Sequence, residues 1–168
     1  TSHDSLVMTQ LGPTISYFTP LTRGPDGQFD LGSILPTLGD NYHPQGVVPI
    51  TGAEHKQLTL QTTFSSQPGL IVPVSDEAGN LEQDGDPLEF EDQAYFAYMH
   101  PDKPLVYVPL YNPDDDSSDP HNPTGLLQLL TPAEDGEWEK QTGFIQPDRA
   151  SLMQVDPRGE VLLLTDEV

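Results

Sequence analysis

The fold is decided by the stretch Leu58-Thr59-Leu60-Gln61-Thr62-Thr63-Phe64, in which apolar and polar side chains largely alternate. Successive side chains of a β-strand point to opposite faces of its sheet, so a period of two is typical of a strand. We expect a strand with a buried face formed by Leu58, Leu60 and Phe64. Its other face, with Thr59, Gln61 and Thr63, is expected to be solvated.

Similar short apolar runs recur on both sides of this stretch, and Pro or Gly separates them. The chain contains 18 Pro and 14 Gly, and a proline inside a helix costs about 3 kcal/mol. Many short strands without a strand–helix rhythm predict an all-β fold, a β-sandwich with a single jelly roll as the favoured topology. The expected strands are Leu6–Gln10, Thr14–Thr19, Val47–Thr51, Leu58–Phe64, Gly69–Val74, Gln93–Met99, Leu105–Tyr111, Leu126–Leu130, Phe144–Ile145 leading on to Ser151–Val155, and Val161–Thr165.

Three prolines and one segment depart from this pattern. Pro49, Pro73 and Pro109 fall inside strand-like runs, and they predict edge strands or bulges there, because proline donates no hydrogen bond to a sheet. Ala133–Lys140 is the best candidate for a short helix, since Glu134 stands three residues after Thr131 as in a capping box.

The length of 168 residues suits one domain with long Pro/Gly-rich loops. We expect residues 1–40 to form an N-terminal arm or edge strands that pack on the domain or on a neighbour. Residues 41–168 are expected to form a single β-sandwich domain. The opening residues show no basic segment followed by an apolar one, so no signal peptide is expected.

Charge is the strongest compositional feature, because 6 Lys and Arg stand against 27 Asp and Glu for a net charge of −21. Such a surface repels phosphates and anionic lipid headgroups, which disfavours direct binding of nucleic acid and direct membrane insertion. Screening at about 1 M salt shortens the Debye length to about 3 Å and relieves the internal repulsion. The composition therefore predicts a protein adapted to high salt.

Catalytic patterns are missing from the sequence. The chain has no cysteine, which excludes thiol chemistry and disulfides. No phosphate-binding glycine loop, nucleophile elbow or histidine metal motif occurs. The histidines are expected in surface turns, as at His43-Pro44 and His100-Pro101. We expect no enzyme and no organic cofactor.

One acidic run is a candidate for calcium. Asp114, Asp116 and Asp119 supply hard oxygen ligands at high density, although Asp119 and Gly125 fall where an EF-hand needs Gly and Glu. A solvated acidic turn is the alternative. On the first interpretation the chain is a calcium-dependent carbohydrate-binding or surface interaction module, and a third interpretation treats the carboxylates as an acidic DNA mimic that inhibits a nucleic-acid-binding protein.

Apolar and aromatic residues offer a different kind of site. The runs 105–111 and 162–164 are apolar on both faces, which is typical of a doubly covered sheet or of an element buried against a partner. The expected interface residues are Ile15, Tyr17, Phe18, Tyr107, Tyr111, Leu162 and Leu164.

An acidic, lysine-poor, cysteine-free and proline-rich β-domain of this kind resembles the β-rich capsid or capsid-associated structural proteins of halophilic archaeal viruses. The resemblance extends over the whole chain and rests on no single motif. It implies a non-enzymatic virion component that assembles with copies of itself and with other virion proteins. Localisation in a virion is expected, with an extracellular or cytoplasmic place in a halophile as the alternative.

Overall fold

The computed structural model describes residues 5–10, 16–39, 42–53, 56–63, 69–77, 80–94, 96–111, 125–146, 150–160 and 162–166. Within these ranges every regular element is a strand, which confirms the all-β class. The strands are β1 (Ser5–Gln10), β2 (Tyr17–Arg23), β3 (Phe29–Leu31), β4 (Leu35–Pro36), β5 (Tyr42–Pro49), β6 (Lys56–Thr63), β7 (Leu70–Glu77), β8 (Asn80–Gln83), β9 (Leu88–Glu89), β10 (Gln93–Ala94), β11 (Tyr98–Met99), β12 (Val106–Tyr111), β13 (Gly125–Pro132), β14 (Trp138–Gln146), β15 (Ala150–Val155) and β16 (Leu162–Asp166).

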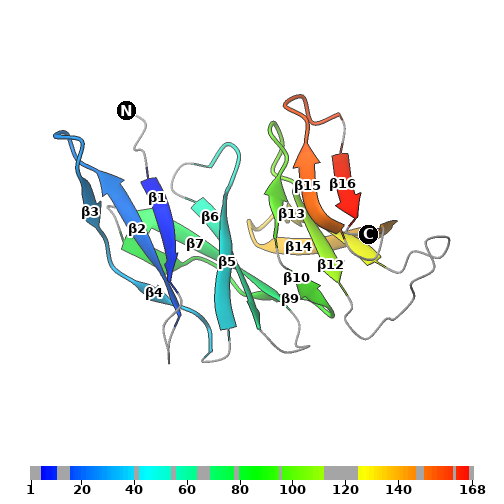
Figure 1. Ribbon diagram of the computed structural model, residues 1–168, viewed down its shortest axis with the longest axis horizontal. Coiled ribbons are helices and arrows are strands. Elements are labelled where there is room, and N and C mark those ends of the chain that lie inside the picture. Colours follow the sequence, from blue (N-terminus) through cyan, green and yellow to red (C-terminus); the bar gives the residue numbers. More distant parts are fainter. Residues whose placement is uncertain are drawn as a thin grey trace.

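These strands form three larger antiparallel sheets and one hairpin (Figure 1). Sheet A has the order β1-β2-β3, with β4 also beside β2. Sheet B has the order β5-β6-β7-β8, with β9 beside β7, and sheet C has the order β10-β12-β13-β14, with β11 beside β12. Strands β15 and β16 pair only with each other among the described strands. Most neighbours are consecutive in sequence, as in a meander, and a jelly-roll sandwich is not confirmed.

Sheet B is the middle layer, because a separate apolar core packs on each of its faces. One core joins Leu58, Leu60 and Ile71 of sheet B to Val106 and Leu130 of sheet C. The only tryptophan of the chain, Trp138, also belongs to this core and is 8% exposed.

The second core lies between sheets A and B. Phe18 of β2 is fully buried there against Leu70, Val72 and Val74 of β7, with Leu81 of β8 beside them. Residues 70–74 therefore alternate between the two cores, since Ile71 belongs to the first. A strand buried on both faces reads as a continuous apolar run, as Leu70 to Val74 does.

The second face of β6 corrects the sequence analysis. Thr59 and Gln61 were expected in solvent, yet both are buried because sheet A covers them. The Thr59 Oγ1 donates a hydrogen bond to the Val72 carbonyl at 3.2 Å, and the Gln61 Oε1 accepts one from the Leu38 N–H at 3.0 Å. Buried polar groups need such partners. The burial of Leu58 and Leu60 is confirmed, while the side chain of Thr63 and all of Phe64 lie outside the described residues.

The prolines behave in two ways. Pro49 ends β5, an edge strand of sheet B, as predicted. Pro73 and Pro109 instead lie in inner strands, at the points where the neighbouring strand on one side is split in two: β8 and β9 beside β7, and β10 and β11 beside β12. The Pro73 carbonyl accepts a hydrogen bond from the Asp84 N–H at 2.9 Å, so its missing donor faces that split.

The prediction of a helix at Ala133–Lys140 is wrong. Residues 133–136 form a tight turn in which the Gly136 N–H donates to the Ala133 carbonyl at 3.1 Å, and β14 begins at Trp138. Gly136 has φ +90°, a left-handed conformation that glycine adopts without steric cost. The same turn, with a positive-φ glycine as its fourth residue, follows β2 at residues 24–28 and β15 at residues 156–160.

Candidate functional site

The most unusual surface feature is an exposed apolar edge on sheet A. Its members are large side chains within ten residues of one another, and no other large hydrophobic side chain is exposed among those described. Isolated exposed apolar residues are common, whereas four large ones along one short segment are a candidate interaction surface. The exposed fractions are 52% for Phe29, 69% for Leu31, 60% for Ile34 and 46% for Leu38.

This edge exists because β3 is the last strand of sheet A. The turn at 24–28 brings the chain back antiparallel to β2, so that Leu31 pairs with Leu21 and Phe29 with Arg23. Phe29 and Leu31 are two residues apart and therefore share one face of the sheet. Along the described chain, sheet B reaches this side of sheet A in one β-bridge, between Ser33 and Asn80.

The backbone of β3 has an open side as well. The Gly24 N–H donates to the Gln28 carbonyl at 2.8 Å, and the Gly32 N–H donates to the Pro20 carbonyl at 2.9 Å. In an antiparallel pair, residues alternate between pointing their backbone groups toward the partner and away from it. The N–H and C=O groups of Phe29 and Leu31 therefore point away from β2, so the residues with exposed side chains also present the open backbone edge.

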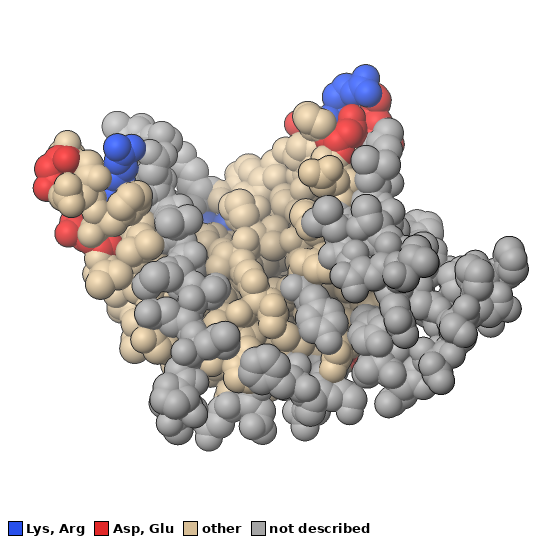
Figure 2. Space-filling model, in the orientation of Figure 1, with Lys and Arg blue, Asp and Glu red and all other residues tan. Residues whose placement is uncertain are grey.

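Charged residues lie around the apolar edge, and one of them, Asp30, lies within β3 between Phe29 and Leu31. All Asp and Glu residues of described burial are exposed except Asp92 and Asp156, which are half-buried. Figure 2 shows charged side chains at two raised ends of the face in view, and most of the coloured residues between these ends are uncharged. By their place in Figure 1, these ends are the turn after β2 and the turn after β15.

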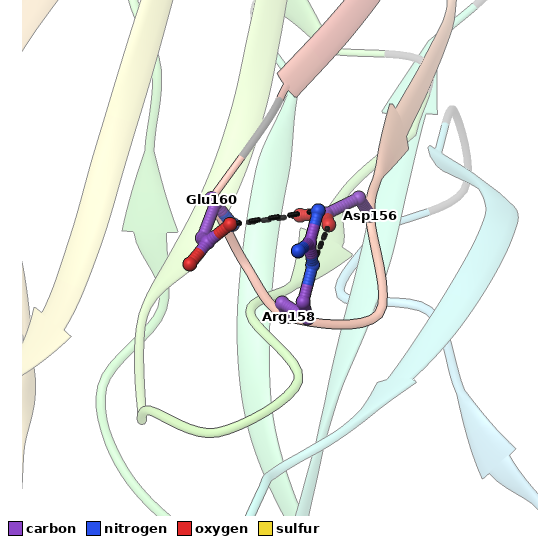
Figure 3. Close-up of polar contacts among 3 residues, drawn as sticks. All are labelled: Asp156, Arg158 and Glu160. Atoms are coloured by element: carbon purple, nitrogen blue, oxygen red, sulfur yellow. Dashed lines mark hydrogen bonds and ion pairs between the residues drawn. The ribbon is translucent and has the colours of Figure 1, made fainter.

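The second surface feature is a cluster of charged residues in the turn after β15 (Figure 3). The Asp156 Oδ1 accepts a hydrogen bond from the Glu160 N–H at 2.7 Å. Its Oδ2 lies 3.2 Å from the Arg158 Nε, and the Arg158 Nη2 lies 3.5 Å from the Glu160 Oε2. These contacts hold the turn in shape. Exposed ion pairs contribute at most about 1 kcal/mol each.

His100 lies beneath this turn and corrects another prediction. It was expected at the surface, but it is 3% exposed, and its ring stacks on that of Tyr107 with centroids 6.4 Å apart. The His100 Nδ1 accepts a hydrogen bond from the Asp102 N–H at 3.1 Å. Burial raises the pKa of the Tyr107 hydroxyl above its usual value of 10.0. The ring packs sheet C against the β15–β16 hairpin, which is a structural role.

Three of the interface residues proposed from sequence have described side chains, and these have different surroundings. Tyr17 is half-buried and Phe18 lies in the second core, while Tyr107 stacks on His100. The backbones of Tyr111, Leu162 and Leu164 lie in β12 and β16, but their side chains are outside the described set. Ile15 and the proposed calcium ligands Asp114, Asp116 and Asp119 are also outside the described residues.

The exposed residues of the apolar edge were missed, although a signal was present. Phe29 and Leu31 alternate with polar residues directly after the turn dipeptide Asp26-Gly27, which is a hairpin signature. Across the described ranges, no three His, Asp or Glu side chains come together as metal ligands. No helix in that part of the chain has the length and apolar character needed to cross a membrane.

Comparisons of the chain with protein-family models, with curated proteins and with solved structures produced no match. The function must therefore be argued from the apolar edge itself.

Proposed function

We propose that the chain is a non-enzymatic structural protein that assembles through protein–protein interfaces, as a capsid or capsid-associated component of a virion adapted to high salt. The observation that carries the proposal is the exposed apolar edge formed by Phe29, Leu31, Ile34 and Leu38. Exposed apolar clusters on soluble proteins are typical of contact surfaces. The halophilic and virion parts of the proposal rest on the composition and on the resemblance in class.

The charge supports assembly that depends on salt. Copies of a chain with a net charge of −21 repel one another at low ionic strength, and apolar contacts must overcome that repulsion. Salt at about 1 M and above screens exposed charges beyond about 3 Å and leaves apolar burial intact. Copies and other virion proteins are therefore expected to join at high salt and to separate at low salt.

Sedimentation velocity across a salt series tests this proposal. The wild-type protein is expected to form larger species as the salt rises above about 1 M. Changing Leu31 and Ile34 together to Thr should keep the protein monomeric, because it removes apolar area without changing the charge. Gln154→Thr, an exposed change on β15, is the matched control and should assemble as the wild type does. A protein that stays monomeric at every salt concentration contradicts the proposal.

A further inference from the structure

We propose that the open backbone side of β3 binds an extended, lysine- or arginine-bearing segment of a different protein, which adds to sheet A as a further strand. The inference rests on the proposed function in that it uses Phe29 and Leu31 of the same apolar edge. It goes further by naming the binding mode and the chemistry of the partner.

The backbone geometry supports strand addition. The N–H and C=O groups of Phe29 and Leu31 point away from β2, whereas the Gln28 carbonyl accepts a hydrogen bond from the Gly24 N–H and the Gly32 N–H donates one to the Pro20 carbonyl. A strand laid beside β3 would pair with these outward groups, as in other complexes that form by adding a strand to a sheet edge. Native edge strands are commonly protected by being short, or by charged side chains, proline or a bulge. β3 (Phe29–Leu31) is 3 residues long and carries the charge of Asp30, but it has no proline and no bulge within its bounds. An acidic charge disfavours pairing with another acidic edge and still admits a basic strand.

Charge complementarity indicates a basic partner. Asp30 lies between Phe29 and Leu31 in β3, and both Asp26 and Asp30 are exposed. A partner strand that alternates apolar with basic residues would pack its apolar side chains beside Phe29 and Leu31 and place its charges beside Asp30. At low salt a second copy of β3 brings Asp30 itself and the same net charge, so a basic segment fits this edge better. At high salt these charges are screened, and copies can meet through the apolar side chains.

A set of labelled seven-residue peptides tests the proposal by fluorescence anisotropy at low salt. The first alternates lysine with valine, the second glutamate with valine, and the third lysine with serine. The lysine–valine peptide is expected to bind at least about tenfold more tightly than either of the others, because only it supplies both the charge and the apolar side chains. Equal binding of the lysine–serine peptide would reduce the effect to general charge attraction and overturn the proposal.

Two variants separate the backbone from the side chain. Leu31→Pro removes an outward N–H and keeps the bonds from β3 to β2, since proline is tolerated on the open side of edge strands. This variant should bind the lysine–valine peptide about tenfold more weakly than the wild-type protein does. Leu31→Thr keeps the N–H and should bind the lysine–valine peptide more tightly than Leu31→Pro does. If the two variants bind equally, or if Leu31→Pro binds as the wild type does, strand addition is wrong.

The outcomes distinguish this inference from the proposed function. Assembly at high salt without peptide binding would overturn the inference alone. Peptide binding by a protein that stays monomeric at every salt concentration would overturn homotypic assembly alone. If Leu31→Pro abolishes self-association and no peptide binds, the edge belongs to a second copy and the basic partner is excluded. A thermal unfolding curve for each variant, compared with that of the wild type, checks that the variant is folded.

Discussion

The backbone of Gly159 lies directly against the buried imidazole of His100, and a Cβ added at Gly159 would overlap that ring. Gly159 also has φ +71°, so the turn after β15 needs glycine for two reasons: its backbone conformation and its contact with the ring. This contact fixes the β15–β16 hairpin against sheet C.

Gly159→Ala is expected to lower the free energy of unfolding by about 2–5 kcal/mol. Left-handed strain contributes about 1–2 kcal/mol of this loss, and the overlap with His100 contributes about 1–3 kcal/mol. Gly136→Ala is the matched control, because Gly136 has φ +90° but nothing within 4 Å of an added Cβ, and it should cost only the strain. Urea denaturation measures both values, and equal losses would contradict the contact with His100.

Thr62→Val is expected to stabilise the protein by about 1 kcal/mol. The Thr62 side chain is 2% exposed, and within the described structure its Oγ1 has no hydrogen-bond partner, so its burial is uncompensated. Thr59→Val on the same strand removes an Oγ1 that donates to the Val72 carbonyl, and it should destabilise by about 1 kcal/mol. Denaturation curves should show that the two variants change the free energy of unfolding in opposite directions. A change in the same direction would contradict the difference in hydrogen bonding between Thr62 and Thr59.

Stability is expected to fall as the pH rises through 10.0. Burial raises the pKa of Tyr107 above 10.0 in the folded protein, so the unfolded chain loses this proton first and alkaline pH favours unfolding. The pKa of Tyr42 is raised too, by burial and then by Glu89. Tyr107→Phe cannot ionise at this position and should lose less stability between about pH 9 and pH 11. An unchanged pH profile for this variant would contradict the prediction.

Asp92→Asn is expected to stabilise the protein at neutral pH. Burial, and then the charge of Glu91, raise the pKa of Asp92 above 3.8, so its contribution to stability is lost as the pH rises through that value. The gain should vanish near pH 3, where the carboxyl is protonated in both states. Asp135→Asn removes an exposed charge and controls for general repulsion. Thermal unfolding at both pH values measures the difference, and an equal gain from both variants would leave no role for burial.

Local pattern was sufficient to predict the all-β class. Leu58 and Leu60 are buried as their alternation predicts, and most apolar runs are strands. Pattern failed for Thr59 and Gln61 on the opposite face of β6, because their burial depends on sheet A, which comes from residues far away in the sequence. A period of two identifies a strand, but it does not show whether a second layer covers the polar face.

The helix was predicted wrongly and the apolar edge was not predicted at all, for related reasons. The spacing of Thr131 and Glu134 fits a capping box, but Gly136 takes a left-handed conformation and the chain turns back as a hairpin. At β3, alternation after Asp26-Gly27 indicates a strand. The exposure of Phe29 and Leu31 depends on which strands lie beside them. The sequence of one segment does not show which strands these are.

Sheet B separates the two apolar cores, and its inner strand β7 contributes side chains to both. Losing either core would expose one face of β7 to water, with Ile71 on one side and Val72 on the other. Neither core can therefore melt while the other keeps its full apolar contacts. The chain is expected to unfold in a single calorimetric transition, as one cooperative unit with two interiors.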